Sequence, residues 1–187
     1  MNIFGLGNPG LRYRSTRHNA GYMFCDKMAK MYHARYSVRH GYKFATVKIS
    51  GKGVNLIKPL CWMNQTGIAI AEILQHLDGD FMVVLDDFNL PLGTVRLRNK
   101  GSDGGHLGLR SIINSLGRSD FPRLRIGIGC PEDNVMTYVL TAFKRREKKI
   151  LNTVIEEGIK GIEIMFKQGF TKAQNYINSV NLLDLDR

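Results

Sequence analysis

The sequence predicts an α/β fold: a single domain over residues 1–187, with a mixed, mostly parallel twisted sheet that includes a β-hairpin and has helices on both faces. Two continuous apolar runs, at residues 1–6 and 81–85, are typical of strands buried in a parallel sheet. Segments with helical periodicity separate these runs from later strand patterns. A hairpin pattern over residues 43–57 argues against a purely parallel sheet.

The first strand pattern runs into Gly7-Asn8-Pro9-Gly10, which breaks it at the C-terminal end, where open α/β sheets usually place ligands. Asn19 is a suitable cap for a helix that continues to about residue 33, with an apolar stripe of Met23, Phe24, Met28 and Met31. The hairpin follows: residues 43–50 alternate, residues 51–53 turn, and residues 54–57 return.

The second half alternates in the same way. A loop over residues 58–67 leads into a helix over 68–77, and the buried strand 81–85 then ends at Asp86 and Asp87. The remaining expected elements are a strand at 94–98, a glycine-rich loop at 100–108 that we expect to be mobile, a helix at 109–116, a strand at 124–129, and helices at about 146–167 and 172–177.

Composition narrows the functional class. The 27 Lys and Arg residues against 16 Asp and Glu residues give a net charge of +11, which suggests a polyanionic partner, most often nucleic acid. No apolar run approaches the roughly 20 residues of a membrane span, and the N-terminus lacks the pattern of a signal peptide. A cytoplasmic protein without a membrane partner is the expectation.

Three cysteines, Cys25, Cys61 and Cys130, are an odd number and lack the spacing of metal ligands. They predict reduced thiols and no metal site. No cofactor is expected.

The letters Gly5-Leu6-Gly7-Asn8-Pro9-Gly10 match GxGxxG, so a dinucleotide site is one alternative. The context disagrees with it. Residues 11–17 lack a helical stripe, and the nearest acid, Asp26, falls inside the predicted first helix instead of after a second strand.

His18 and Asp86 are the candidate catalytic pair. A carboxylate at a neighbouring strand end could bond one imidazole nitrogen and leave the other free as a base. The sequence has no GxSxG elbow, so attack by an activated water is favoured over a covalent acyl-enzyme. The amides of Asn8 and Asn64 suit contacts to that water or to an oxyanion.

Basic residues cluster twice. The first group, Arg96, Arg98 and Lys100, borders the glycine-rich loop, and Arg123 and Arg125 could join it from the next strand to bind phosphate. The second group is expected to be a solvated helix start and comprises Lys144, Arg145, Arg146, Lys148 and Lys149.

Several of these segments together resemble the bacterial peptidyl-tRNA hydrolase family, in the family's order and over nearly the whole chain. The matching motifs are GLGNPG with Y and TRHNAG, KP with WMNQTG, LDDFNLPLG, GSDGGHLGLRSI and RLRIGIG. The resemblance implies a mixed sheet between helices and a metal-independent hydrolase acting on the ester between a peptide and the 3′ ribose of tRNA.

The resemblance also implies roles for particular residues. His18 would be the general base, Asp86 would hold its tautomer, Asn8 would sense the acylated nitrogen, and Asn64 would grip the substrate near the ester. Further substrate or tRNA contacts are expected from Tyr13, Trp62, Met63, Gly104, Gly105, Arg96, Arg98, Lys100 and Arg125. The expected partner is the acceptor arm and 3′ end of peptidyl-tRNA, bound by a monomer that needs no obligate protein partner.

The sequence departs from the family at Leu107, where an asparagine is usual, and Trp62 replaces the usual phenylalanine. Leucine cannot hydrogen-bond water, so one polar contact is lost. A non-catalytic RNA-binding relative of the same fold therefore stays open as the alternative at this point.

Overall fold

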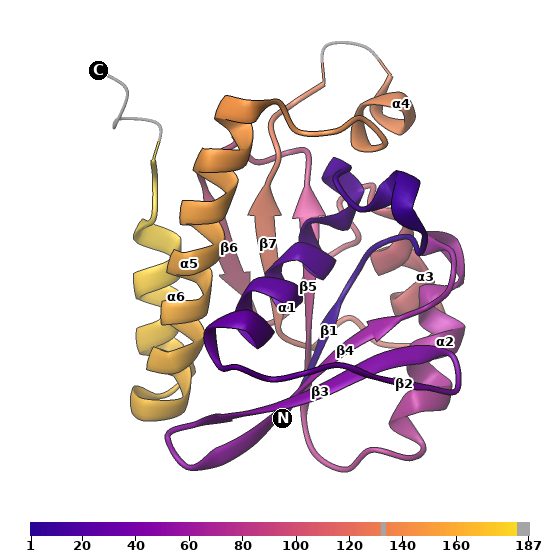
Figure 1. Cartoon of the computed structure of the whole chain (residues 1–187), viewed down its shortest axis with the longest axis vertical. Coiled ribbons are helices and arrows are strands. Elements are labelled where there is room, and N and C mark those ends of the chain that lie inside the picture. The colour runs from indigo at the N-terminus through magenta and orange to yellow at the C-terminus, as the bar shows by residue number, and fades with distance from the viewer. Residues whose placement is uncertain (132–133, 183–187) are drawn as a thin grey trace.

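A seven-stranded sheet forms the centre of the computed structural model, which describes residues 1–131 and 134–182 (Figure 1). The strand order is β2-β3-β4-β1-β5-β7-β6, in which β4, β1, β5 and β7 run parallel while β2, β3 and β6 pair antiparallel to a neighbour. The strands are β1 (Asn2–Gly5), β2 (Ser37–Arg39), β3 (Tyr42–Ile49), β4 (Lys52–Pro59), β5 (Phe81–Asp87), β6 (Val95–Arg98) and β7 (Arg123–Gly127). The expected mixed α/β fold is confirmed.

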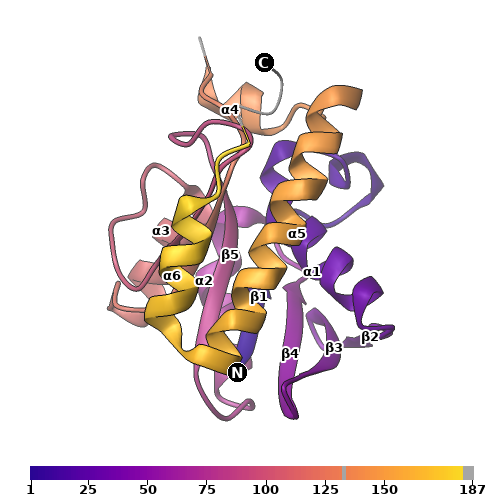
Figure 2. The same cartoon turned by 90° about the vertical axis from the view of Figure 1, so that its left-hand side faces the viewer.

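Helices cover both faces of this sheet, as the sequence predicts (Figure 2). One apolar cluster joins α1 and α5 to the strands, and a second joins α2 and α3 to the opposite face. The α-helices are α1 (Ala20–Met31), α2 (Thr66–Leu74), α3 (Leu107–Leu116), α4 (Val135–Val139), α5 (Arg145–Gln168) and α6 (Phe170–Ser179). None of the described helices is both long and apolar enough to cross a bilayer.

The free edge of β6 is closed by α6 (Figure 1). The Leu97 N–H donates to Asn178 Oδ1 at 2.8 Å, and Gln174 Nε2 donates to the Leu97 carbonyl at 3.1 Å. These side chains replace the hydrogen bonds that another strand would make, so this edge is not an open template for pairing.

The structure differs from the sequence prediction in the position of the hairpin turn, in the burial of one residue of α1 and in two short elements. The hairpin turn is Ser50-Gly51, not residues 51–53, because both residues adopt positive φ (50° and 78°) and form a two-residue turn. Met31 is 43% exposed and lies outside the core stripe. The short elements β2 and α4 were not expected, since neither has enough length for a periodic pattern.

Two glycines set where the chain enters α1. A Cβ on Gly21 would lie 2.2 Å from the Val84 carbonyl oxygen, and one on Gly5 would lie 2.4 Å from the Gly21 carbonyl oxygen. Only glycine allows the first turn of α1 to rest directly on the backbone of β1 and β5. The short 3₁₀ turn η2 (Arg17–Asn19), which precedes α1, is thereby held over the C-terminal ends of those strands.

Candidate active site

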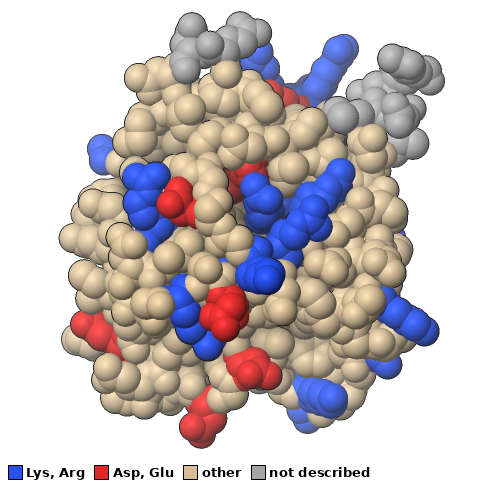
Figure 3. Space-filling view, turned by 180° about the vertical axis from the view of Figure 1, so that it is seen from behind, with Lys and Arg blue, Asp and Glu red and all other residues tan. Residues whose placement is uncertain are grey.

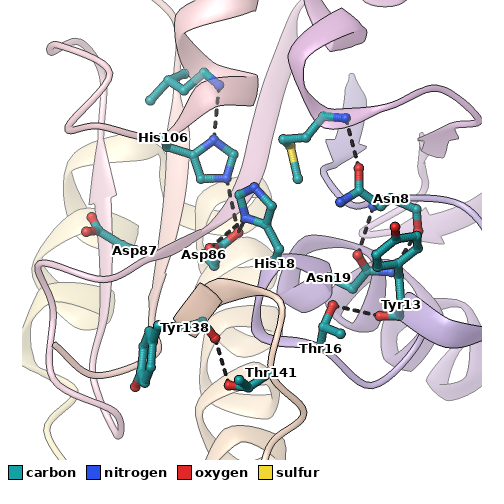
Figure 4. A network of polar contacts seen from close by, with 12 residues as sticks. Asn8, Tyr13, Thr16, His18, Asn19, Asp86, Asp87, His106, Tyr138 and Thr141 are labelled. Carbon is teal, nitrogen blue, oxygen red and sulfur yellow. Dashed lines mark hydrogen bonds and ion pairs between the residues drawn. The ribbon is translucent and has the colours of Figure 1, made fainter. Parts of the chain in front are cut away.

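His18, Asp86 and His106 converge at the C-terminal end of β5 (Figure 4). Nδ1 of His18 lies 3.0 Å from both carboxylate oxygens of Asp86, and Nε2 of His106 lies 3.0 Å from Oδ1. Asp86 is 1% exposed. The sequence paired His18 with Asp86 correctly, but it did not identify His106, whose only signal is its place after two glycines at the start of a helix.

The hydrogen bonds fix the proton positions on both rings. The Leu109 N–H donates to Nδ1 of His106 at 3.1 Å, so the proton of His106 is on Nε2 and is donated to Asp86. Since an ionised carboxylate only accepts, Nδ1 of His18 also carries a proton. The Nε2 lone pair of neutral His18 is therefore free.

Burial and charge act in opposite directions on this pair. Burial by itself lowers the pKa of His18, but the negative charge and hydrogen bond of Asp86 outweigh it and raise the pKa above the ordinary 6.5. Burial likewise opposes ionisation of Asp86, yet the two imidazoles hold its pKa well below the ordinary 3.8. Asp86 is thus a carboxylate over the whole range in which His18 titrates.

Asn8 presents a donor next to this pair. Its Oδ1 accepts the Met63 N–H at 2.9 Å, while its backbone N–H and C=O bond the Asn19 side chain at 2.8 and 3.0 Å. With Oδ1 occupied, the Asn8 side chain offers its NH₂ group. Asn19 holds this loop instead of capping α1 with its side chain, which corrects the expected capping role.

A pocket of about 280 Å³ opens beside His18. Its polar lining residues include Asn8, Tyr13 and Asn64, and its apolar ones are Trp62, Met63, Leu107, Met136, Val139 and Leu140. The Tyr13 and Trp62 rings meet edge to face, with centroids 5.8 Å apart. Four positions expected to contact substrate, Tyr13, Trp62, Met63 and Asn64, thus line one pocket with His18.

Arg17 anchors the segment that carries His18. Its guanidinium forms two bonds to Glu147 at 2.7 and 2.8 Å, bonds the Ala142 carbonyl at 2.9 Å, and packs on the rings of Tyr138 and Phe143. Arg17 is 4% exposed. The adjacent catalytic candidate is therefore fixed from both sides, by Arg17 through α5 and by Asp86 through β5.

The arginines of β6 and β7 share the sheet face opposite α5, because Arg96 pairs with Arg125 and Arg98 with Arg123 while Val95, Leu97, Leu124 and Ile126 point into the core. A band of Lys and Arg side chains crosses this face of the molecule (Figure 3). Arg98 and Lys100 are exposed, Arg96 is half-buried, and Arg125 is half-buried and paired with Asp87.

Arg123 does not join this surface, contrary to expectation. It is 1% exposed and donates to the carbonyls of Gly101, Ser102 and Ser119, and burial lowers its pKa to about 10, with the nearby charge of Arg125 contributing. Sequence alternation placed Arg123 on the correct face but could not show that the loop folds over it.

Those contacts tie down the glycine-rich loop. Asn89 Nδ2 donates to the Gly104 carbonyl at 2.9 Å, and Asp103 accepts the Gly105 N–H and pairs with Arg110. Gly104 and Gly105 have φ values of 58° and 86°, and a Cβ on Gly105 would meet the Phe88 ring at 2.8 Å. The loop is thus held at several points by hydrogen bonds and an ion pair.

His18, Asp86 and His106 also form the one described group whose ligand atoms are spaced for a metal ion, within 4.8 Å of one another. The same atoms are hydrogen-bonded, with protons on both imidazole nitrogens that face Asp86. A metal would have to displace both protons, so the geometry is accounted for by hydrogen bonds.

Comparison with known proteins decides the family. The family model described as peptidyl-tRNA hydrolase matches residues 2–184. The chain belongs to the peptidyl-tRNA hydrolase family. It is 40% identical to the peptidyl-tRNA hydrolase of Caldicellulosiruptor saccharolyticus, covering 94% of this chain and 95% of that one, and 39% identical to that of Bacillus subtilis, covering 95% and 97%.

The fold of the family matches as well. The crystal structure of peptidyl-tRNA hydrolase from Acinetobacter baumannii superposes with a TM-score of 0.90 at 29% identity, covering 96% of this chain and 95% of that chain. The dinucleotide alternative disagrees with both the family and the fold: after Gly10 come two short 3₁₀ turns, Leu11–Tyr13 and Arg17–Asn19, and α1 begins only at Ala20. The GxGxxG letters of this peptidyl-tRNA hydrolase are therefore not followed by the helix of a dinucleotide-binding site.

Proposed function

We propose that this chain hydrolyses the ester between the peptide and the 3′ ribose of tRNA, with a water activated by His18, and so releases free tRNA and peptide from stalled or aborted translation. The observation that carries the proposal is the free Nε2 of His18, which faces a pocket while Asp86 holds the opposite nitrogen. Family membership supplies the reaction, and the buried pair supplies its base.

The proposed steps follow from these proton positions. Nε2 of His18 takes a proton from water as the water oxygen attacks the ester carbonyl carbon, and the resulting imidazolium then protonates the 3′ oxygen as it leaves. Asp86 stabilises the imidazolium without taking its proton. A positioned base contributes about 10²–10⁴ in rate, and amide donors to the oxyanion add a similar factor.

The test is release of N-acetylated amino acid from purified N-acetyl-aminoacyl-tRNA by the wild-type protein. Cleavage at a rate above that of the buffer supports the enzyme, whereas tRNA retention on a filter without cleavage would instead support the RNA-binding relative. The family match and the intact pair do not favour that alternative. Leu107 lines the pocket, so Leu107→Asn measures what its missing polar group costs.

Asn8 is proposed to select acylated substrates. Its NH₂ group can donate to the acyl carbonyl of a peptidyl-tRNA. It cannot hydrogen-bond the free α-ammonium group of an aminoacyl-tRNA, because both groups are donors.

Replacing Asn8 is therefore expected to weaken discrimination against aminoacyl-tRNA. Asn8→Ala should shift the ratio of kcat/KM values toward the free amine about fivefold, as expected for one neutral hydrogen bond, and Asn8→Asp should shift it further because a carboxylate accepts from ammonium. The measurement compares deacylation of one tRNA carrying the same amino acid with and without an N-acetyl group. Exposed Asn114→Ala is the control, and an unchanged ratio in both Asn8 variants would reject this role.

Other pocket residues are proposed to hold the substrate around the ester. Asn64 would donate or accept next to the scissile carbonyl, while Tyr13, Trp62 and Met63 would pack against the terminal adenosine and aminoacyl group. Gly104 and Gly105 would let the acceptor arm approach the loop closely, since neither has a side chain.

The basic residues of this face are proposed to bind acceptor-arm phosphates, with exposed Arg98 and Lys100 and half-buried Arg96 and Arg125 as the contact residues. This role fits their common face beside the site.

A single neutralised contact on this face gives a measurable salt effect. Arg98→Gln is expected to raise KM several-fold, leave kcat nearly unchanged, and reduce the slope of log(kcat/KM) against log[salt] by about 1. Arg146→Gln, also exposed but in the cluster at the start of α5, is the matched control. If the two variants had the same salt slope, the acceptor-arm phosphates would not bind at Arg98.

The pH profile follows from the raised pKa of His18. Since the base must be neutral, kcat/KM should rise tenfold per pH unit in acid and level off through a midpoint above 6.5. Asp86 stays ionised over this whole pH range, so it adds no second titration to the profile below that midpoint. Rates on one peptidyl-tRNA from pH 5 to 9 measure it, and a midpoint below 6.5 would contradict a base paired with a carboxylate.

We also propose that residues 1–187 form one domain that acts as a monomer. The proposed location is the cytoplasm, because translation there produces the substrate. All proposed catalytic groups come from one chain, which supports a monomer.

A further inference from the structure

A second pocket lies on the far side of the Asn8–Gly10 loop. It has a volume of about 260 Å³, and Asn8 belongs to the walls of both this pocket and the catalytic one. We call it the basic pocket, after Arg14, Lys43 and Lys58 in its wall. Nothing in the proposed chemistry at His18 uses it.

The charges of the basic pocket are unbalanced. Lys58 pairs with Asp26, and its ammonium also lies 4.5 Å from the Tyr36 ring centroid, so it is satisfied. The side chains of Arg14 and half-buried Lys43 form no ion pair or hydrogen bond with any residue in the ranges 1–131 and 134–182. Asp26 is the one acid among the lining residues, and it is already paired, so an added anionic group would meet two available cations.

The sheet order indicates which part of the substrate reaches this pocket. The arginine face belongs to β6 and β7 at one end of the sheet. Asp86 belongs to the central strand β5 and is bonded to His18, while Lys58 and Lys43 belong to β4 and β3, beyond β1 (Figure 1). A peptidyl-tRNA is linear, with RNA, ester and peptide in that order. When RNA lies on the arginine face and the ester lies at His18, the peptide continues toward β4.

We infer that the basic pocket is a subsite for the peptide upstream of the esterified residue, and that it prefers an acidic side chain there. This inference rests on the proposed function, because the direction of the substrate follows from the position of the ester. Carboxylates pair with arginine and lysine at partly exposed sites with modest gains, so a preference of about three- to tenfold is expected.

The experiment uses peptidyl-tRNAs that share one tRNA and one C-terminal amino acid and carry Glu, Gln or Lys at either of the two preceding positions. For wild type, kcat/KM should be highest for Glu and lowest for Lys at one of these positions. The double variant Arg14→Gln/Lys43→Gln should bring Glu, Gln and Lys substrates to similar rates. Lys48→Gln, exposed on the same strand as Lys43 but outside the pocket, should keep the wild-type order.

Two results would overturn the inference. One is equal wild-type rates for Glu, Gln and Lys at both positions. The other is a double variant that slows all substrates by one factor, keeps the wild-type Glu-to-Lys ratio and lowers the salt slope, since these cations would then contact RNA. Failure of the proposed function is a separate result, because wild type would then leave N-acetyl-aminoacyl-tRNA uncleaved.

Discussion

Replacing His18 by alanine is expected to lower kcat for peptidyl-tRNA hydrolysis by about 10²–10⁴, because the variant lacks the only base that faces the catalytic pocket in the proposed mechanism. KM should change much less, since the proposed phosphate contacts lie on and next to β6 and β7, away from His18. Single-turnover release of N-acetyl amino acid measures the chemical step directly.

The chain offers matched controls for this variant. His33 and His76 are exposed and do not line the catalytic pocket, so His33→Ala and His76→Ala should retain wild-type rates. A His18→Ala variant that folds normally and stays as fast as these controls would refute the mechanism.

Asp86→Asn is expected to have an effect of similar size through the tautomer of His18. The carboxylate accepts from two imidazoles at once, whereas a carboxamide offers one acceptor and one donor. His106 must keep its Nε2 proton because Leu109 donates to its other nitrogen. The amide NH₂ then faces His18 and places the His18 proton on Nε2, which removes the free base.

The expected loss in kcat is about 10²–10⁴, by analogy with the orienting acid of a catalytic triad. Asp120→Asn, exposed at the protein surface, is the control. The residual activity of Asp86→Asn should also titrate at lower pH than wild type, because the charge that raises the pKa of His18 is gone. A slow variant with the wild-type midpoint would indicate that Asp86 acts only on folding.

The sequence predicted most of the fold, because the strongest patterns came from long elements. The buried run that became β5 and the long helix that became α5 were predicted close to their observed bounds, while α4, only five residues long, is too short to give a periodic pattern. Asn19 shows the limit of local rules: its position suits a cap, but the fold offers its side chain the backbone of Asn8.

The site was predictable where chemistry and strand ends coincided, as for His18 and Asp86. His106 and Arg123 were misjudged because their roles depend on partners distant in sequence. His106 reaches Asp86 across 20 residues, and Arg123 is buried by carbonyls of a loop that composition alone described as open. Proton positions likewise required the Leu109 contact, which no sequence pattern contains.

The contact between α6 and β6 has a consequence for synthesis on the ribosome. The hydrogen-bond partner of Leu97, Asn178, lies 81 residues later in the chain. The strands up to β7 can therefore pair while the outer edge of β6 still has no partner. Closing that edge requires a long-range contact and therefore comes late in folding. A nascent or truncated chain that stops before α6 would expose an unpaired strand to its neighbours, which makes the final helix a safeguard against aggregation as well as a part of the core.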